Sequence, residues 1–112
     1  MKHLEETVKL LNYIHDNPES TQREIVEKFN FSLGKVNYLM QALTKKGTIK
    51  LKRFKNSRKK TAYLYILTPK GIREKTEITK MFLKERLEEY DKLKDEIQSL
   101  TLKLKNSSTN QD

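Results

Sequence analysis

This chain of 112 residues contains no cysteine and no tryptophan, and it has only three glycines and two prolines. The lack of cysteine excludes disulfides, thiolate metal sites and a cysteine nucleophile. Three scattered glycines cannot make a glycine-rich phosphate-binding loop. No apolar run approaches the roughly 18 residues of a membrane-spanning helix. The first residues, MKHLEETVKLL, carry acids where a secretory signal would be basic. We therefore expect a soluble cytoplasmic protein with one modest core.

Candidate catalytic groups are also scarce. His3 and His15 are the only histidines, and on one helix they would lie roughly three turns apart, too far to share a metal ion. The glutamates of the C-terminal part have the spacing of a solvated helix face rather than of an acid–base pair. We therefore predict that the protein is not an enzyme and has neither a metal ion nor a cofactor.

Acidic residues are absent from one long stretch. Between Glu27 and Glu74 lie 46 residues that include thirteen lysines and arginines and no acid. The whole chain has a formal net charge of +9. A long region of one sign is typical of a surface that binds a polyanion, so nucleic acid is the predicted partner. The alternative is a basic surface that has no partner.

Two short helices are predicted at the start of the chain. Apolar residues recur at helical spacing over residues 4–14, and Pro18 ends that helix because proline disfavours the helical conformation of the residue before it. Thr21 and Glu24 have the spacing of a capping box, which begins a second helix. That helix is expected to end near Asn30.

The next elements complete a winged helix. Ser32 and Gly47 are suited to the two caps of a third helix, and its short connection to the second helix is typical of a helix-turn-helix. Residues 48–54 alternate apolar and basic side chains, and residues 62–67 are apolar on both faces, which predicts two strands. The loop over residues 55–61 is polar and basic. A helix-turn-helix followed by a hairpin with a basic tip is a winged helix.

A long helix is predicted to follow. Thr68 and Pro69 suit its N-cap and first turn, and its apolar residues keep nearly heptad spacing as far as Leu104, with Arg86 as an exception. These side chains would be left in water on a monomer, so we predict a homodimer; the alternative is a helix that folds back over its own domain. The predicted dimerisation residues are Leu83, Leu87, Tyr90, Leu93, Ile97 and Leu100.

The predicted fold is thus mostly α-helical with a small β-hairpin wing. We expect a winged helix-turn-helix domain over residues 1–70 and a long, coiled-coil-like dimerisation helix over residues 71–105. The polar residues 106–112 are expected to be disordered.

The stretch AYLYILTPKGIREK, residues 62–75, resembles the MarR family of bacterial winged-helix regulators, whose wing strand runs into an L-T-x-x-G turn and a long helix. Together with SLGKVNYLMQALTKKG, residues 32–47, it is most similar to the exopolysaccharide-associated members. The resemblance implies a dimeric DNA-binding transcription regulator that controls exopolysaccharide genes. Typical members carry Asp-x-Arg in the wing, whereas residues 56–60 read NSRKK, so Arg58 has the place of the arginine that enters the minor groove. The resemblance leaves a small-molecule effector open.

The outer face of the third helix is the predicted DNA-reading surface, because this helix enters the major groove in helix-turn-helix proteins. Asn37 and Gln41 carry amides that can pair with adenine, and Lys35 can reach guanine or a phosphate. Tyr38 either touches a phosphate or packs beside the wing. The predicted DNA-binding residues are Ser32, Gly34, Lys35, Asn37, Tyr38 and Gln41 on the helix, and Arg53, Lys55, Arg58, Lys59 and Lys60 on the wing.

Three other interpretations remain open. In the first, the outer face of the third helix is an ordinary solvated surface. In the second, the winged helix binds nucleic acid without sequence preference or mediates protein contacts. In the third, the chain is a coiled-coil adaptor, which leaves the acid-free basic region unexplained.

Overall fold

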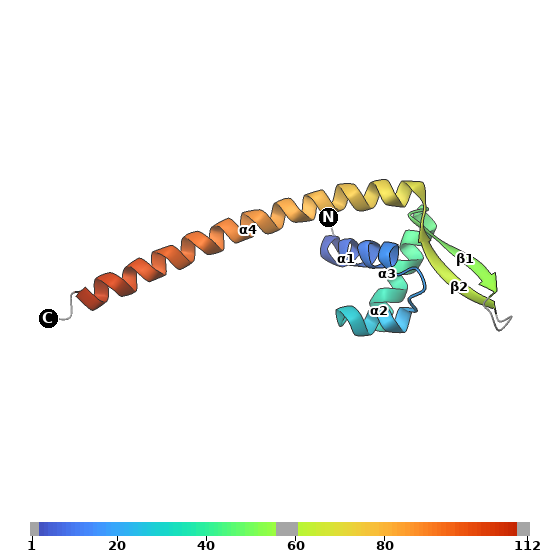
Figure 1. The fold of residues 1–112 in the computed structure, drawn as a ribbon, viewed down its shortest axis with the longest axis horizontal. Coiled ribbons are helices and arrows are strands. Elements are labelled where there is room, and N and C mark those ends of the chain that lie inside the picture. The colour runs from blue at the N-terminus through green and yellow to red at the C-terminus, as the bar shows by residue number, and fades with distance from the viewer. Residues whose placement is uncertain (1–2, 56–60, 110–112) are drawn as a thin grey trace. The chain divides into compact units, whose positions relative to one another are not determined.

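The structure is a computed structural model that describes residues 3–55 and 61–109. Three helices are followed by a two-stranded hairpin and a long helix (Figure 1). This order confirms the predicted class, mostly α-helical with a β-hairpin wing and a long C-terminal helix. The elements are α1 (Leu4–Asp16), α2 (Gln22–Phe29), α3 (Leu33–Lys46), β1 (Ile49–Lys55), β2 (Thr61–Leu67) and α4 (Pro69–Thr109).

The helix-turn-helix is delimited by the predicted caps. The hydroxyl of Thr21 accepts the backbone N–H of Glu24 at 3.1 Å and begins α2. The hydroxyl of Ser32 accepts the backbone N–H of Lys35 at 3.1 Å and begins α3. α3 ends at Gly47, whose φ of 80° is left-handed and therefore suits glycine.

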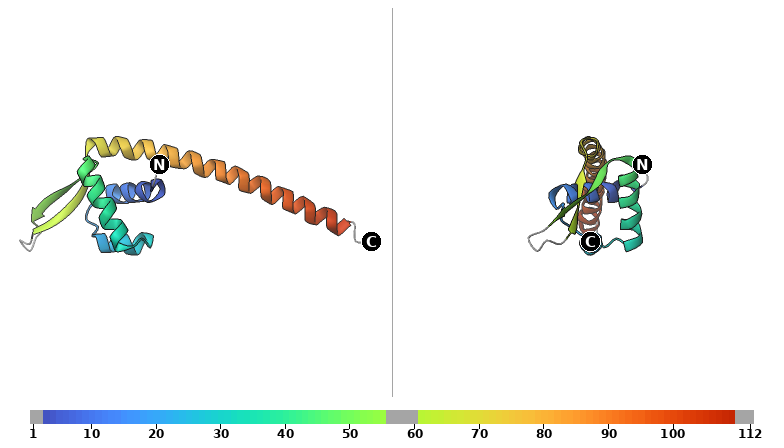
Figure 2. Two further views of the ribbon diagram at one scale, coloured as in Figure 1. Left: turned by 180° about the vertical axis from the view of Figure 1, so that it is seen from behind. Right: turned by 90° about the vertical axis from the view of Figure 1, so that its right-hand side faces the viewer.

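The core lies where α1, α2 and α3 meet the base of the hairpin. Figure 2 shows the three helices gathered together, with the hairpin extending to one side of them. Burial of the apolar faces supplies the driving force, at roughly 1.5–3 kcal/mol for each large apolar side chain. The most deeply buried apolar side chains are Leu10, Leu11, Ile14, Ile25, Val36, Met40 and Ile49.

The hairpin is anchored at its base and becomes exposed toward its tip. β1 and β2 are antiparallel, with Ile49 opposite Leu67 and Arg53 opposite Tyr63. Ile49 and Leu67 are buried, but Tyr63 is 51% exposed. One backbone hydrogen bond, from the N–H of Tyr65 to the carbonyl of Pro18 at 3.2 Å, ties β2 to the loop after α1.

The first turns of α4 pack with the winged helix. Ile78 is buried, and the side-chain amide of Asn12 on α1 donates to the hydroxyl of Thr79 at 3.1 Å. The compact unit consequently extends to Thr79, whereas the sequence placed its boundary at residue 70. The sequence pattern could not show this, because these contacts join positions far apart in the chain.

The rest of α4 forms a second unit that begins at Lys80. The helix continues to Thr109, so residues 106–109, which were predicted to be disordered, are helical. A started helix gains one hydrogen bond for each added residue, and no proline stops this one. Residues 110–112, the remainder of the predicted tail, lie outside the described residues. Among the helices of residues 3–55 and 61–109, none is both long enough and apolar enough to cross a membrane.

Candidate nucleic-acid interface

The outer face of α3 carries a pair of exposed amides. Val36 and Met40 hold the inner face of α3 in the core, so the opposite face of the helix points to solvent. Asn37 and Gln41 are both exposed on it, one turn apart. The amide nitrogen of Gln41 lies 3.5 Å from the amide oxygen of Asn37. The two amides therefore form a small polar surface, one turn long.

The amide pair lines a groove between the helix-turn-helix and the hairpin. The groove has a volume of about 420 Å³. Across it, the amide nitrogen of Gln22 on α2 lies 3.3 Å from the hydroxyl of Tyr65 on β2. The groove is lined by Gln22, Asn37, Met40, Gln41, Thr44, Lys45, Leu51 and Tyr65.

Several of these groove residues were not predicted as site residues. Thr44 and Lys45 could have been found from their spacing, because Lys45 lies four residues after Gln41 on the same helix. Gln22, Leu51 and Tyr65 come from other elements, and only the packing of the hairpin against α2 brings them to the groove.

Two other predicted residues at the start of α3 have partners within the protein. Ser32 uses its hydroxyl as the cap of the helix. The ammonium of Lys35 forms an ion pair of 3.2 Å with the carboxylate of Glu6 on α1. A hydrogen bond to the backbone at Glu6, followed by the contact with Lys35, holds the pKa of the Glu6 carboxyl below its ordinary value of 4.5. To contact DNA, the ammonium of Lys35 must therefore either break its ion pair with Glu6 or bind Glu6 and a DNA group at the same time.

Gly34 and Tyr38 lie at the exposed N-terminal part of the same face. A Cβ added to Gly34 would meet nothing within 4 Å, so the protein itself does not require glycine there. Tyr38 is 62% exposed. Its ring lies edge-on to His3 at the start of α1, with 6.3 Å between the ring centroids. Among the described residues, the ring contact of Tyr38 is thus with His3 in the N-terminal region.

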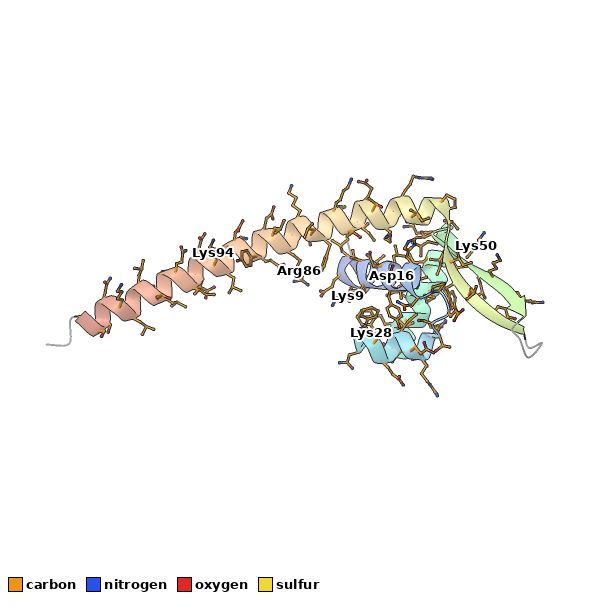
Figure 3. All side chains as sticks on the ribbon, viewed as in Figure 1. Lys9, Asp16, Lys28, Lys50, Arg86 and Lys94 are labelled. Carbon is orange, nitrogen blue, oxygen red and sulfur yellow. The ribbon has the colours of Figure 1, made fainter. Side chains whose placement is uncertain are left out.

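The hairpin carries basic side chains along its length. Arg53 is exposed, and its guanidinium lies 5.9 Å from the ring centroid of Tyr63 on the facing strand. Lys50, labelled in Figure 3, and Lys52 are also exposed on β1. The side chain of Lys55 and the whole of Arg58, Lys59 and Lys60 lie outside the described residues.

The acid-free stretch of sequence does not remain acid-free in space. Glu74 on α4 lies 3.6 Å from the ammonium of Lys46 and 3.5 Å from that of Lys70. With the Lys35–Glu6 pair, three basic residues in the described part of this stretch have an acidic partner. Exposed basic side chains of this stretch that lie outside these pairs include Lys50, Lys52 and Arg53 on β1, Lys45 on α3, Lys28 on α2 and Arg73 on α4.

The predicted dimerisation residues all lie on α4 within the second unit, and within the single chain they are exposed. Their exposed fractions run from 51% to 60%. A stripe of large apolar side chains at helical spacing is what the contact face of a coiled coil presents. The stripe consists of Leu83, Leu87, Tyr90, Leu93, Ile97 and Leu100.

Comparison with known proteins agrees with this geometry. Residues 7–50 match a family model described as winged helix-turn-helix DNA-binding. They include α2, α3 and most of α1. The chain carries a winged helix-turn-helix. Among curated proteins, none matches its sequence.

Solved structures of MepR from Staphylococcus aureus, a transcription regulator of the multidrug efflux pump MepA, have a similar fold. The TM-score is 0.58 for one structure of MepR and 0.62 for the MepR–DNA complex. In both comparisons the identity is 20%, and the match covers 98% of this chain and 80% of MepR. The fold likeness thus extends to nearly the whole chain, and not only to the residues that the family model matches.

Proposed function

We propose that this protein is a sequence-specific, double-stranded DNA-binding transcription regulator of the MarR type that acts as a homodimer. The observation that carries the proposal is the exposed pair of Asn37 and Gln41 on α3, in a groove bordered by α2 and the hairpin. The family-model match and the fold likeness to the MepR–DNA complex support it.

The α3 residues divide into two roles in this proposal. Asn37 and Gln41 pair with base edges in the major groove, since an amide can donate to adenine N7 and accept from its N6 amino group. Gly34 allows the helix to approach the DNA backbone closely, because nothing of the protein fills the space beside its Cα. Ser32, Lys35 and Tyr38 contact phosphates at the same end of the helix.

The wing residues are proposed to supply affinity rather than base recognition. Arg53 and Lys55 belong to β1, and Lys59 and Lys60 follow in the sequence before β2. In this proposal all four neutralise phosphates. Arg58 is assigned to the minor groove, where a narrow A-tract attracts arginine.

Dimerisation is assigned to the apolar stripe of α4, from Leu83 to Leu100. Burying these side chains between two helices offers a large driving force, because each exposes more than half of its surface within one chain. A two-fold dimer presents two copies of α3 to one duplex, so we expect an inverted-repeat site with half-site centres about one helical turn apart.

The sequence resemblance also assigns the regulated genes. We propose control of exopolysaccharide genes on that resemblance alone. The test is to locate the bound sequence in the genome that encodes this protein. A site upstream of exopolysaccharide genes is expected, and sites only upstream of unrelated genes would contradict the assignment.

Fluorescence-anisotropy titration with labelled duplex DNA at two salt concentrations tests the DNA-binding proposal. Each phosphate contact contributes about 0.9 to the slope of log K against log salt, so affinity should fall steeply as salt rises. An adaptor protein would show no salt-dependent binding, and that result would contradict the proposal. A duplex of unrelated sequence serves as the control for base recognition.

A further inference from the structure

The part of α4 beyond Thr79 has a regular heptad register. Leu83, Tyr90, Ile97 and Leu104 fall at one repeating position, called a, seven residues apart. Arg86, Leu93, Leu100 and Ser107 fall at the second, called d. Positions a and d are those that face a partner helix in a coiled coil, and the flanking positions e and g determine which partner and which orientation are preferred.

The helix surface already contains a hole of the kind that a coiled coil fills. A groove of about 170 Å³ on α4 is lined by Tyr90, Leu93, Lys94, Ile97 and Gln98. Tyr90 and Ile97 are successive a residues, Leu93 is the d residue between them, and Lys94 is the e residue. In a coiled coil, four residues at these positions surround one side chain of the facing helix. The face is therefore shaped for another helix of the same spacing.

The charges beside the seam favour one orientation for a second copy of this chain. In a parallel, in-register pair, each g residue faces the e residue five positions later on the partner. Glu89 then faces the partner's Lys94 on both sides of the pair. Phe82 faces the partner's Leu87, so this flank is apolar. Both contacts are favourable.

Antiparallel pairing is less favourable, because g residues then face g residues and e residues face e residues. If Tyr90 lies opposite the partner's Leu93, Glu89 meets the partner's Glu96, and Lys94 meets the partner's Leu87 instead of an acid. A shift of one heptad brings Glu89 to the partner's Lys103. That register places Glu96 against the partner's Glu96, Lys94 against the partner's Lys94 and Leu83 against the partner's Ser107, so it introduces repulsion and loses an apolar layer.

Arg86 is the one charged residue on the seam, and its guanidinium contacts two side chains of its own helix. Its guanidinium lies 4.7 Å from the ring centroid of Phe82, and its Nη1 lies 2.9 Å from a carboxylate oxygen of Glu89. Phe82 and Glu89 are both g residues. The charge is thus held along the edge of the seam, and the aliphatic stem is left to face the partner. Figure 3 labels Arg86 and Lys94 on α4.

From these observations we infer that two copies of this chain pair through α4 as a parallel, in-register two-stranded coiled coil, in which Glu89 of each chain pairs with the partner's Lys94. The inference rests on the homodimer of the proposed function and adds its orientation, register and specificity-determining pair. Parallel pairing leaves both N-terminal ends of the paired segments on one side.

Charge reversal distinguishes the two orientations. Lys94→Glu should weaken self-association about tenfold in sedimentation equilibrium at low salt, since both interchain pairs become repulsive. Lys103→Glu has the same change of net charge, and in the parallel pair it should leave association nearly unchanged. The double variant Glu89→Lys/Lys94→Glu should restore association. A larger loss for Lys103→Glu than for Lys94→Glu would overturn the inference.

Disulfide trapping gives a second readout, because the natural chain has no cysteine. Ser107→Cys places one thiol at a d position, where the two copies of a parallel pair come within disulfide distance. Mild oxidation of this full-length variant should yield covalent dimers. The antiparallel register shifted by one heptad instead predicts cross-links between Leu83→Cys and Ser107→Cys chains in a mixture, and neither antiparallel register predicts any between two Ser107→Cys chains.

The outcomes separate the inference from the proposed function. A wild-type chain that is monomeric in sedimentation equilibrium contradicts the proposed homodimer and the inference with it. A dimer that gives only Leu83→Cys to Ser107→Cys cross-links overturns the inference alone. Binding to duplex DNA, measured on the same samples, tests the remaining part of the proposed function independently.

Discussion

The buried hydroxyl of Thr48 donates a hydrogen bond of 2.9 Å to the carboxylate of Glu74. Thr48 lies at the start of the hairpin and is fully buried, while Glu74 belongs to α4. The carbonyl of Thr48 also accepts the backbone N–H of Thr68 at 3.1 Å. The base of the wing is therefore joined to the first turns of α4 by a partly buried polar contact rather than by apolar packing alone.

Removing this carboxylate should destabilise the winged-helix unit. Glu74→Ala leaves the hydroxyl of Thr48 without its acceptor and should cost roughly 1–2 kcal/mol in the free energy of unfolding. Glu74→Gln keeps an acceptor oxygen and should cost less. Urea unfolding measures both, with Glu88→Ala on the exposed face of α4 as the control. Equal stability of Glu74→Ala and the wild type would show that the contact is not stabilising.

The same carboxylate predicts a pH dependence of stability. Burial acts to raise the pKa of Glu74, but the hydrogen bond from Thr48 and the charges of Lys46 and Lys70 outweigh it, so the pKa lies below its ordinary value of 4.5. A lowered carboxyl pKa stabilises the folded state above the unfolded-state pKa, and this contribution is lost as pH falls through the folded-state pKa. The pKa of Glu6 is lowered as well.

The free energy of unfolding should consequently decline as pH is lowered below about 4.5. Glu74→Gln should reduce this decline because one titrating group is removed. The measurement is a series of urea unfolding curves between neutral pH and the acid range. The same pH dependence in Glu74→Gln and the wild type would contradict the role assigned to Glu74.

Two glycines in helices should respond in opposite ways to alanine. A Cβ on Gly71 would overlap the carbonyl of Thr48, so Gly71→Ala should destabilise the fold by roughly 1–3 kcal/mol. Gly34→Ala meets open space and should stabilise it by about 0.5–1 kcal/mol, because alanine is the better helix former.

If Gly34 allows close approach to DNA, Gly34→Ala should also weaken DNA binding although it stabilises the protein. Thermal unfolding and anisotropy titration on the same preparation measure the two effects. Unchanged DNA affinity would remove Gly34 from the interface.

Alanine at Asn37 or at Gln41 should lower affinity for the preferred duplex by roughly 1–3 kcal/mol. Binding to an unrelated duplex should barely change, because these amides are proposed to pair with bases and not with phosphates. Lys45→Ala is a matched comparison from the same groove: it should weaken both duplexes alike and reduce the salt slope by about 0.9. Equal losses on both duplexes for Asn37→Ala would assign that amide to the DNA backbone instead.

The sequence predicted the elements well where the signals are local. The caps at Thr21, Ser32 and Gly47 depend on neighbours within a few residues, and the structure confirms each of them. It did not predict that Glu6 pairs with Lys35 or that Glu74 lies beside Lys46, because those partners are brought together only by the packing of α1 and α4 on α3.

In the candidate site, too, the local features could be predicted from the sequence and the contacts between distant residues could not. The spacing of α3 was enough to place Asn37 and Gln41 on one exposed face. The groove that they line also needs Gln22 and Tyr65, which come from α2 and β2. No periodicity along the chain connects these residues, so the groove could be found only from the three-dimensional structure.

Selection of bound sequences from a random pool of duplex DNA tests the central claim most directly. The wild-type protein should enrich an inverted repeat with half-site centres about one helical turn apart. The double variant Asn37→Ala/Gln41→Ala, selected in parallel, should retain salt-dependent binding but lose the enrichment. A wild-type protein that enriches no sequence, or a double variant that enriches the same sequence as the wild type, would contradict the claim that α3 reads DNA.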